Sequence, residues 1–416
     1  MSQIQKIPTP KAIPLWNNFT KKLLEPPPFS FNPCLFNFYK KHFNWKPYYF
    51  MLTNNDEVCA ILPLVYTGKS WVSLPHFSYG GMLLEENSTP QLTSNIFNIL
   101  ITSITTTKLA PAFYTYNINN ESHFPLPRGP GGGSPPKSDL RVSPLPLSRG
   151  PGGGSSPKQD ILGNPLPLPR GPGGGSFPIR KDIRPGLLIR TLTKTNTNST
   201  KTEKVTSILK LPSNKDDLLT MLSHNLKRKI NKAKKSEITI KSGRLELLDD
   251  FYSIYSRNIH KLNSLNYGKG FIKDLFSTYE YGDIKIFVAY LNNSPIGSSL
   301  LAGYNGFYEN IFFATSIKAR KYYISDLLHW EMIKFSIDNN NNAPHSATNG
   351  VYSFGRSTIN SGVHKYKSHW PITDHPIYHS SNMPNIRKQS WLQYIWRVIP
   401  YPISSPLGAK LIIHIY

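Results

Sequence analysis

Near the end of the 416-residue chain, a short segment combines cations, glycines and aromatic residues: SFGRSTINSGVHKYKSHW, Ser353–Trp370. Gly355 and Gly362 relax the backbone there, and Arg356 offers a planar guanidinium that suits phosphate or carboxylate. Two lysines add positive charge, Lys365 and Lys367. The segment therefore predicts a binding site for an anionic donor or acceptor. In the alternative interpretation, its aromatic side chains belong to the core and its cations extend to solvent.

The elements that must position this segment are predicted as strands alternating with helices. Two apolar runs joined by a polar connection predict a hairpin over Pro47–Gly68. Three further strands are expected at Ile284–Leu291, Ser298–Tyr304 and Tyr308–Thr315. A basic helix is expected over Lys215–Lys235, with one apolar stripe formed by Leu222, Leu226, Ile230 and Ala233. Helices flanking mixed sheets make the fold class α/β, or α+β.

The charge of the chain is strongly unbalanced. It has 48 Lys and Arg against 24 Asp and Glu, a net charge of +24, which favours anionic partners such as nucleic acid, cofactor phosphates or an anionic membrane surface. Cys34 and Cys59 stand far apart without neighbouring metal ligands, so we expect no zinc site, no metal and a reducing cytoplasm. No apolar run is long enough for a transmembrane helix, and the first residues do not form a secretory signal.

A segment of different composition interrupts the chain at residues 125–185. The motif RGPGGGS recurs there at a constant spacing, as Arg128–Ser134, Arg149–Ser155 and Arg170–Ser176. Repeated glycine and proline support neither helix nor strand, so we predict a disordered, partly polyproline-like linker. A proline-rich ligand for a partner domain is the alternative. The insert carries nine cations and three anions, so most of the positive charge belongs to the flanking segments.

Six short segments, in this order, resemble the FemAB-like branch of the GNAT acyltransferase superfamily, especially its single-chain members from bacterial exosortase and exopolysaccharide systems. They are ILPLV at Ile61–Val65, SLPHFSYGGMLLE at Ser73–Glu85, NLKRKINKAKKS at Asn225–Ser236, DFYSIYSRN at Asp250–Asn258, LLHWEMI at Leu327–Ile333 and FGRSTINSGVHKYKSHW at Phe354–Trp370. The tail WRVIPYPISSPLGAKL, Trp396–Leu411, also resembles that family's ending. The resemblance covers nearly everything outside the insert.

The resemblance implies two GNAT-like lobes with a cleft between them. The N-terminal lobe would span residues 12–124, and the C-terminal acyltransferase lobe would span residues 186–380. A basic, aromatic tail would follow at residues 381–416. The insert at 125–185 would then separate the lobes, where added length costs little closure entropy.

The resemblance also implies which residues hold the donor. GNAT enzymes grip the donor's pyrophosphate with backbone amides at the start of a helix. Three cations precede the helix that we expect to begin near Ser325: Lys318, Arg320 and Lys321. With Arg356, Ser361, Lys365 and Lys367, they form the predicted site for acyl-CoA, or for an aminoacyl-tRNA, as co-substrate. The alternative for the loop is a solvated basic surface.

Catalytic and acceptor-binding residues are harder to assign. The candidates for chemistry are Arg356, Ser357 and His260, the last as a general base, although a histidine on a helix is more often structural. The expected acceptor-binding residues are His76, Tyr79, Gly80, Gly81 and Tyr255. We expect the group that removes the proton from the amine to be one of these candidates, an unidentified group or a water molecule.

The cations of Lys227–Lys235 allow three interpretations. They form a solvated helix face, they attract a tRNA-linked donor, or they rest with the aromatic tail on an anionic membrane. No aromatic residue alternates with these cations, so sequence-specific DNA binding is not expected.

The function predicted from these features is N-acyl transfer to an amine on a cell-envelope precursor, of peptidoglycan or exopolysaccharide. The enzyme would act in the cytoplasm, or at the inner face of the inner membrane. The alternative is a catalytically inactive, basic protein that binds RNA or another anionic polymer.

Overall fold

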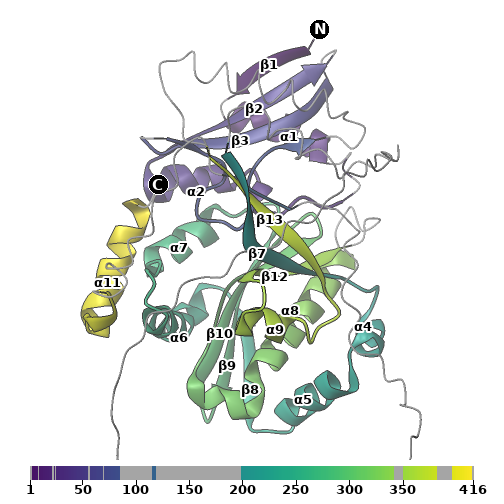
Figure 1. The fold of residues 1–416 in the computed structure, drawn as a ribbon, viewed down its shortest axis with the longest axis vertical. Helices are drawn as coiled ribbons and strands as arrows, with labels where there is room; N and C mark the ends of the chain where they lie inside the picture. The colour runs from purple at the N-terminus through teal and green to yellow at the C-terminus, as the bar shows by residue number, and fades with distance from the viewer. Residues whose placement is uncertain are drawn as a thin grey trace, which may run out of the picture. The chain divides into compact units, whose positions relative to one another are not determined.

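The computed structural model describes residues 2–7, 9–20, 23, 25–54, 57–68, 70–84, 115–118, 198–341, 350–381 and 396–414. All of them belong to one compact unit, built from Met1–Glu121 and Arg184–Tyr416. The predicted linker at residues 125–185 lies outside the described residues, and its disorder stays a prediction. Figure 1 shows two sheets with helices packed against them, as the α/β prediction requires.

The first sheet is antiparallel and is built from the start of the chain. Its order is β1 (Ser2–Ile7), β2 (Lys46–Asn54), β3 (Glu57–Tyr66) and β4 (Trp71–Val72), with β5 (Leu83–Leu84) also paired to β3. The predicted hairpin is therefore confirmed as β2 and β3. Two helices belong to this part of the chain, α1 (Thr9–Thr20) and α2 (Leu35–Phe43). The residues of β3 between its two ends are all buried. Because alternate side chains of a strand point to opposite sides, both faces of β3 are covered.

The second sheet has eight strands in the order β6, β13, β7, β12, β11, β10, β9 and β8. Their bounds are β6 Thr115–Ile118, β7 Asn198–Lys210, β8 Ile238–Gly243, β9 Asp283–Leu291, β10 Ser294–Tyr304, β11 Phe307–Thr315, β12 Val351–Thr358 and β13 Thr373–Ser381. The strands predicted near residues 284–315 are confirmed as β9, β10 and β11. Every neighbouring pair in this sheet is antiparallel except β11 and β12, which run parallel.

Helices cover both faces of the second sheet. On one face, α6 (Leu248–Lys261) and α7 (Lys269–Thr278) share a core with Ile286 and Val288 of β9 and with α1 and α2. On the other, α5 (His224–Lys234) and α8 (Ile324–Asn341) share a core with Phe287 and Ala289. Because the first core also contains Ile61 and Val65 of β3, the two sheets are joined by one continuous hydrophobic cluster. Trp16 reinforces it by donating from Nε1 to the Tyr304 hydroxyl at 2.8 Å.

One predicted helix was wrong in its extent. The helix expected over Lys215–Lys235 is broken into α4 (Lys215–Met221) and α5, because Leu222 is extended and the Ser223 side chain caps the second helix by accepting from the Leu226 N–H. All four residues of the predicted stripe are nevertheless buried. Helix α8 begins at Ile324, which confirms the expected start near Ser325, after Tyr323 in the left-handed conformation with φ +57°.

Candidate active site

The parallel strands β11 and β12 part shortly after they meet. Their paired residues are only Phe307–Glu309 and Val351–Ser353. Beyond that point β11 continues along β10 to Thr315, while β12 continues along β7 to Thr358. Among the described strands, each therefore keeps a neighbour on its outer side alone. We call this place the strand parting.

A glycine marks the start of the strand parting. Gly355 has φ +72°, a conformation that other residues rarely adopt. The register between β12 and β7 shifts between Ser353 and Arg356, as a bulge requires. A side chain at Gly355 would also approach the Asn310 carbonyl oxygen of β11 to 3.4 Å. The small residue singled out in the sequence is therefore the one that lets β12 bend away from β11.

Two buried residues of opposite charge type lie at the strand parting. Glu309 of β11 is 1% exposed, and Lys367 of helix α9 (Gly362–Lys367) is 5% exposed. Lys367 donates from Nζ to the Gly355 carbonyl oxygen at 2.7 Å and to that of Arg356 at 3.2 Å. Lys367 thus stabilises the bend of β12 and places a positive charge at the strand parting.

Burial brings the pKa values of both groups close to neutrality. Desolvation raises the pKa of Glu309 to about 7, although the Ser78 side chain, Arg356 and Lys367 act in the opposite direction. Desolvation also lowers the pKa of Lys367 to about 8, against the attraction of Glu309 and Asp374. Oε2 of Glu309 is buried and has no hydrogen-bond partner among the described residues. Glu309 can therefore take up and release a proton near neutral pH, as a general base must.

A chain of hydroxyl groups connects this pair with the N-terminal part of the molecule. The Tyr79 hydroxyl lies 2.7 Å from Oγ of Ser353 and 2.5 Å from Oγ1 of Thr206. Ser353 in turn accepts from the Gly355 N–H at 3.1 Å. Burial and the nearby Glu309 raise the pKa of Tyr79, so its phenol stays protonated. A residue of the segment after β4 thus reaches the point where β7, β11 and β12 meet.

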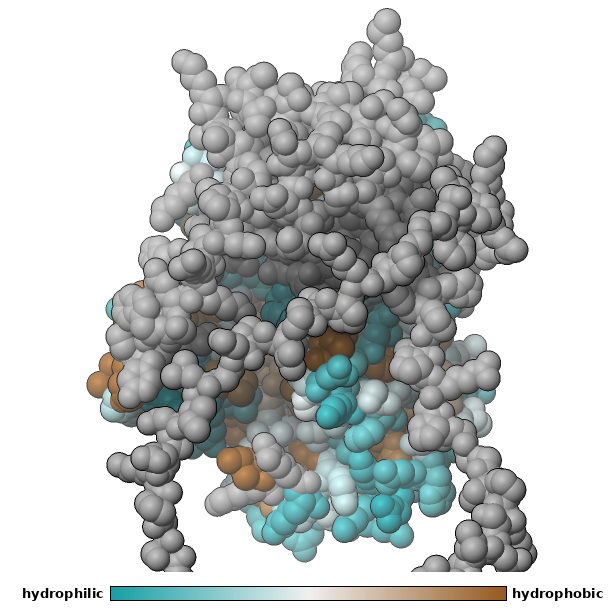
Figure 2. Space-filling model, in the orientation of Figure 1, coloured by the Kyte–Doolittle hydropathy of each residue, from teal (hydrophilic) through white to brown (hydrophobic). Residues whose placement is uncertain are grey.

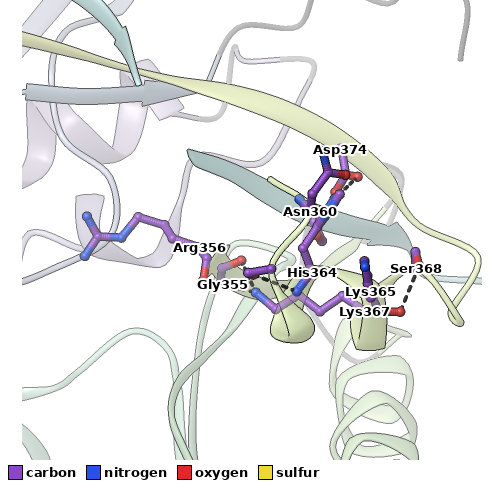
Figure 3. Close-up of polar contacts among 10 residues, drawn as sticks. Gly355, Arg356, Asn360, His364, Lys365, Lys367, Ser368 and Asp374 are labelled. Carbon is purple, nitrogen blue, oxygen red and sulfur yellow. Dashed lines mark hydrogen bonds and ion pairs between the residues drawn. The ribbon is translucent and has the colours of Figure 1, made fainter. Parts of the chain in front are cut away.

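Four predicted residues of the segment after Ser353 lie on β12 or at α9. Arg356 is half-buried on β12, and its charge acts on both Glu309 and Tyr79. Ser357 is buried on the same strand. Ser361 is the N-cap of α9 and accepts from the His364 N–H at 3.2 Å. Figure 3 shows that the Arg356 side chain projects away from His364 and Lys367. Lys365 is exposed.

His364, Asp374 and Ser207 come together, but not as a nucleophilic triad. Nε2 of His364 and Oγ of Ser207 each lie 2.7 Å from a different oxygen of Asp374. Nδ1 of His364 accepts from the Asn360 N–H at 3.1 Å. The imidazole proton is therefore on Nε2 and is donated to the carboxylate, with no imidazole nitrogen bonded to the serine. The group fastens α9 to β13 and β7.

Other predicted residues lie in aromatic packing rather than at the strand parting. Nδ1 of His76 is 3.1 Å from the Tyr267 hydroxyl, and its ring stacks on Phe43 with centroids 4.7 Å apart. Burial lowers the pKa of His76 to about 3, so the ring is neutral at physiological pH. Tyr255 stacks on Phe251 and accepts from the Tyr267 N–H at 3.2 Å.

The remaining candidates have structural contacts of their own. Nδ1 of His260 lies 2.8 Å from Oγ of Ser404, in the helix near the end of the chain. The Gly81 N–H donates to Oγ of Ser73 at 2.8 Å. A side chain at Gly80 would come within 2.6 Å of the Ser73 carbonyl oxygen, so the backbones approach closely here. Site roles for these residues stay predictions.

The predicted donor loop forms a 3-10 turn, η5 (Ile317–Tyr322), directly before α8. Lys321 is exposed, with Nζ 4.8 Å from the centre of the Tyr322 ring. Ser325 lies in the first turn of α8, and the side chains of Lys318 and Arg320 lie outside the described residues. The loop joins the far end of β11 to α8, so it follows the same strand that carries Glu309.

Sequence reasoning missed Glu309. It lies within YENIFFAT, which reads as an ordinary apolar strand. The available signal was the single carboxylate in that run, because a buried carboxylate is costly unless it has a function or a partner. Among the described residues, no group of three or more His, Cys, Asp or Glu side chains could hold a metal ion.

Comparison with known proteins agrees with this architecture. Residues 222–359 match the family model Acetyltransf_6, described as an acetyltransferase (GNAT) domain. This range begins just before α5 and ends just after β12, so it contains Glu309, the donor loop and Arg356. No curated protein gives a significant sequence match.

Two solved structures show the same fold over nearly the whole chain. The crystal structure of FemX superposes with a TM-score of 0.55 at 11% identity, covering 95% of this chain and 100% of that chain. A tandem GNAT protein from the clavulanic acid biosynthesis pathway, solved without AcCoA, superposes with a TM-score of 0.51 at 6% identity, covering 93% of this chain and 100% of that chain. Residues 222–359 thus match a GNAT acetyltransferase domain, and the chain shares its fold with FemX and with this tandem GNAT protein, in agreement with the sequence resemblance.

Proposed function

We propose that the protein transfers an acyl or aminoacyl group from acyl-CoA, or from an aminoacyl-tRNA, to an amine on a cell-envelope or polysaccharide precursor, at the strand parting. The observation that carries this proposal is Glu309, a buried carboxylate with a pKa of about 7 at the point where β11 and β12 separate. An amine nucleophile must lose a proton to become an amide, and a positioned base with a pKa near the working pH is suited to accept it.

The reaction assigns one role to each group. The amine nitrogen attacks the donor carbonyl, the new C–N bond forms, and the bond to the thiol of CoA, or to the ribose oxygen of tRNA, breaks. The proton of the amine passes to Glu309. Protonated Glu309 then returns this proton, through a water molecule, to the departing thiolate or ribose oxygen, which regenerates the base. Tyr79 stays a phenol between Ser353 and Thr206 and holds these strands in place.

The donor lies along the free side of β11 in this proposal. Its phosphates reach the loop before α8, where backbone N–H groups at the helix start favour anions. Lys318, Arg320, Lys321 and Ser325 belong to that loop. Arg356, Ser361, Lys365 and Lys367 add positive charge and hydroxyl groups on the β12 side. The acceptor would then approach from the side of Tyr79 and the glycines Gly80 and Gly81.

A second function is favoured by one observation, the basic surface of α5. The apolar residues of this helix are buried. Four cations on and just after it are exposed: Arg228, Lys232, Lys234 and Lys235. Figure 2 shows a hydrophilic surface in the lower part of the molecule, where Figure 1 places α5. Such a face attracts the phosphates of RNA, either as the carrier of an aminoacyl donor or as the ligand of an inactive binding protein.

Ligand-dependent thermal unfolding separates these two functions. A donor that binds only the folded state raises the melting temperature, by an amount equivalent to about 2.7 kcal/mol at a concentration one hundred times Kd. The enzyme proposal predicts stabilisation by acetyl-CoA or a longer acyl-CoA, lost in Arg356→Ala and kept in the control Arg228→Ala. Salt-sensitive RNA binding without any acyl-CoA effect would support the binding protein, unless purified aminoacyl-tRNA transfers its aminoacyl group to an added amine.

A further inference from the structure

The helix near the end of the chain, α11 (Tyr401–Leu411), packs against α6 through small and polar residues. The Tyr401 hydroxyl lies 2.7 Å from Oγ of Ser256, and Oγ of Ser404 lies 2.8 Å from Nδ1 of His260. Gly408 is buried so closely that a side chain there would come within 2.7 Å of the Asn266 side-chain oxygen. The inner face of α11 therefore contains serine, tyrosine and glycine.

The outer face of the same helix is apolar. Ile403, Leu407 and Leu411 recur every four residues, so they lie along one side of the helix. They are 59%, 36% and 42% exposed, and Val398 just before the helix is 67% exposed. Figure 2 shows hydrophobic residues at the surface on the side where Figure 1 places α11. We call these four residues the α11 apolar stripe.

This arrangement is the reverse of the usual amphipathic helix, in which the apolar side is buried and the polar side faces water. Helix α5 of the same chain follows the usual rule, with Leu226, Ile230 and Ala233 buried. The contacts of α11 with α6 use its serine, tyrosine and glycine residues. They therefore do not explain why its exposed side is apolar. A contiguous exposed apolar surface indicates a contact with something outside the described residues.

The charges around the stripe indicate what this contact is. Residues 396–414 contain Arg397 and Lys410, both exposed, and no Asp or Glu. Residues 257–270, which include the end of α6 that contacts α11, contain exposed Arg257, Lys261 and Lys269 and again no Asp or Glu. Lys269 is paired with the exposed Asp249 at 2.6 Å, so Arg257, Lys261, Arg397 and Lys410 provide the net positive charge beside the stripe. Apolar side chains flanked by a net positive charge are suited to the interface of a bilayer with anionic headgroups.

We infer that α11 is a docking surface for an anionic lipid bilayer. The apolar stripe enters the boundary between headgroups and acyl chains, and the cations contact the headgroup phosphates. Among the helices that the structure describes, none has the length and apolar character needed to cross a membrane. This surface is separate from the strand parting and does not depend on the proposed acyl transfer.

Vesicle co-sedimentation of the full chain tests the inference. We expect binding to vesicles of phosphatidylglycerol and phosphatidylethanolamine, weaker binding to pure phosphatidylcholine, and loss of binding as salt screens the charges. The double substitution Ile403→Glu and Leu407→Glu should reduce binding to anionic vesicles by more than about tenfold. Met221→Glu on α4, another exposed apolar residue, is the matched control and should bind like the unchanged protein.

Three outcomes would overturn the inference. One is the absence of vesicle binding, and another is binding that the double substitution leaves unchanged. The third is a dimer, detected by light scattering, that the double substitution dissociates while vesicle binding persists, because the stripe would then contact a second copy of the chain. Both substituted residues are exposed, so an unchanged melting temperature separates loss of docking from loss of folding.

Discussion

Two regions of this molecule bury an ionisable side chain, and they change its acidity in opposite ways. His76 lies among the rings of Phe43, Trp45 and Tyr267, and burial lowers its pKa to about 3. Glu309 lies at the strand parting with Lys367 and Arg356 nearby, and burial raises its pKa to about 7. Both shifts come from desolvation of the charged form. Only the second places the proton exchange near neutral pH.

The comparison shows why residue type alone does not identify a catalytic base. Histidine is the usual choice because its ordinary pKa lies near neutrality, yet an aromatic environment removes that property from His76. A carboxylate ordinarily ionises far below neutrality, yet desolvation brings Glu309 into the working range. The environment therefore decides which of the two groups can exchange a proton near neutral pH.

The largest loss of unfolding free energy is expected from substitution of Lys367. Lys367→Met would remove the donor to the carbonyl oxygens of Gly355 and Arg356 and a buried positive charge that acts on Glu309. The loss of two hydrogen bonds from a charged donor should cost about 3–5 kcal/mol. Urea unfolding at pH 7.5 measures this loss of unfolding free energy.

Lys365→Met is the matched control for this substitution. Lys365 is two residues away on the same helix but exposed, and its loss should change the unfolding free energy by less than about 0.5 kcal/mol. Equal effects of the two substitutions would show that Lys367 does not balance a buried charge.

A somewhat smaller change in unfolding free energy is expected from the titration of Glu309. Its folded-state pKa of about 7 lies above the ordinary glutamate value of 4.5, so between these values the folded protein holds a proton that the unfolded chain has lost. The contribution to stability is therefore fully present below pH 4.5 and is lost as pH rises through 7, by on the order of 3 kcal/mol. Glu309→Gln should remove this decline.

Unfolding free energies at a series of pH values test this slope. The exposed Glu237→Gln is the control and should leave the decline in place. A Glu309→Gln protein with the same decline as the unchanged protein would mean that another group is responsible.

The smallest effect is expected at His76, with the opposite sign. Its folded-state pKa of about 3 lies below the ordinary histidine value of 6.5, so this contribution to stability is present above pH 6.5 and is lost as pH falls toward 3. His76→Phe should make the protein less sensitive to acid by roughly 1–2 kcal/mol at pH 4, a value reduced for partial exposure.

At neutral pH the same substitution should cost about 1 kcal/mol, for the lost hydrogen bond to Tyr267. The exposed His224→Phe is the control. If His76→Phe and Glu309→Gln changed the pH dependence in the same direction, the contrast between the two regions would be wrong.

Much of the fold could be predicted from local patterns. The strands β2, β3, β9, β10 and β11 follow from apolar runs separated by turn residues, and the buried stripe of α5 follows from its helical period. The break at Ser223 could not be predicted, because a capping serine inside a continuous apolar period looks like an ordinary helix residue. Helix α7 was also missed, since its apolar residues contact α2 and the sheet rather than forming a long period.

The site was predicted only in part. Gly355 and Arg356 stood out because the segment 353–370 concentrates glycines and cations among aromatic residues. Glu309 could not be recognised, because its pKa depends on Lys367, Arg356 and Ser78, which approach it only in the folded protein. The pairing of Tyr79 with Ser353 joins residues separated by 274 positions, a contact that no local pattern reveals.

The pH dependence of acyl transfer tests the central claim most directly. Transfer from acyl-CoA to an amine, followed by release of the CoA thiol, should rise with pH through an inflection near 7 in the unchanged protein. In Glu309→Gln the rate should fall by about 10²–10⁴ and the inflection should disappear, because the base is gone. A folded Glu309→Gln protein that keeps the full rate and the same inflection would contradict the assignment of the strand parting as the acyl-transfer centre.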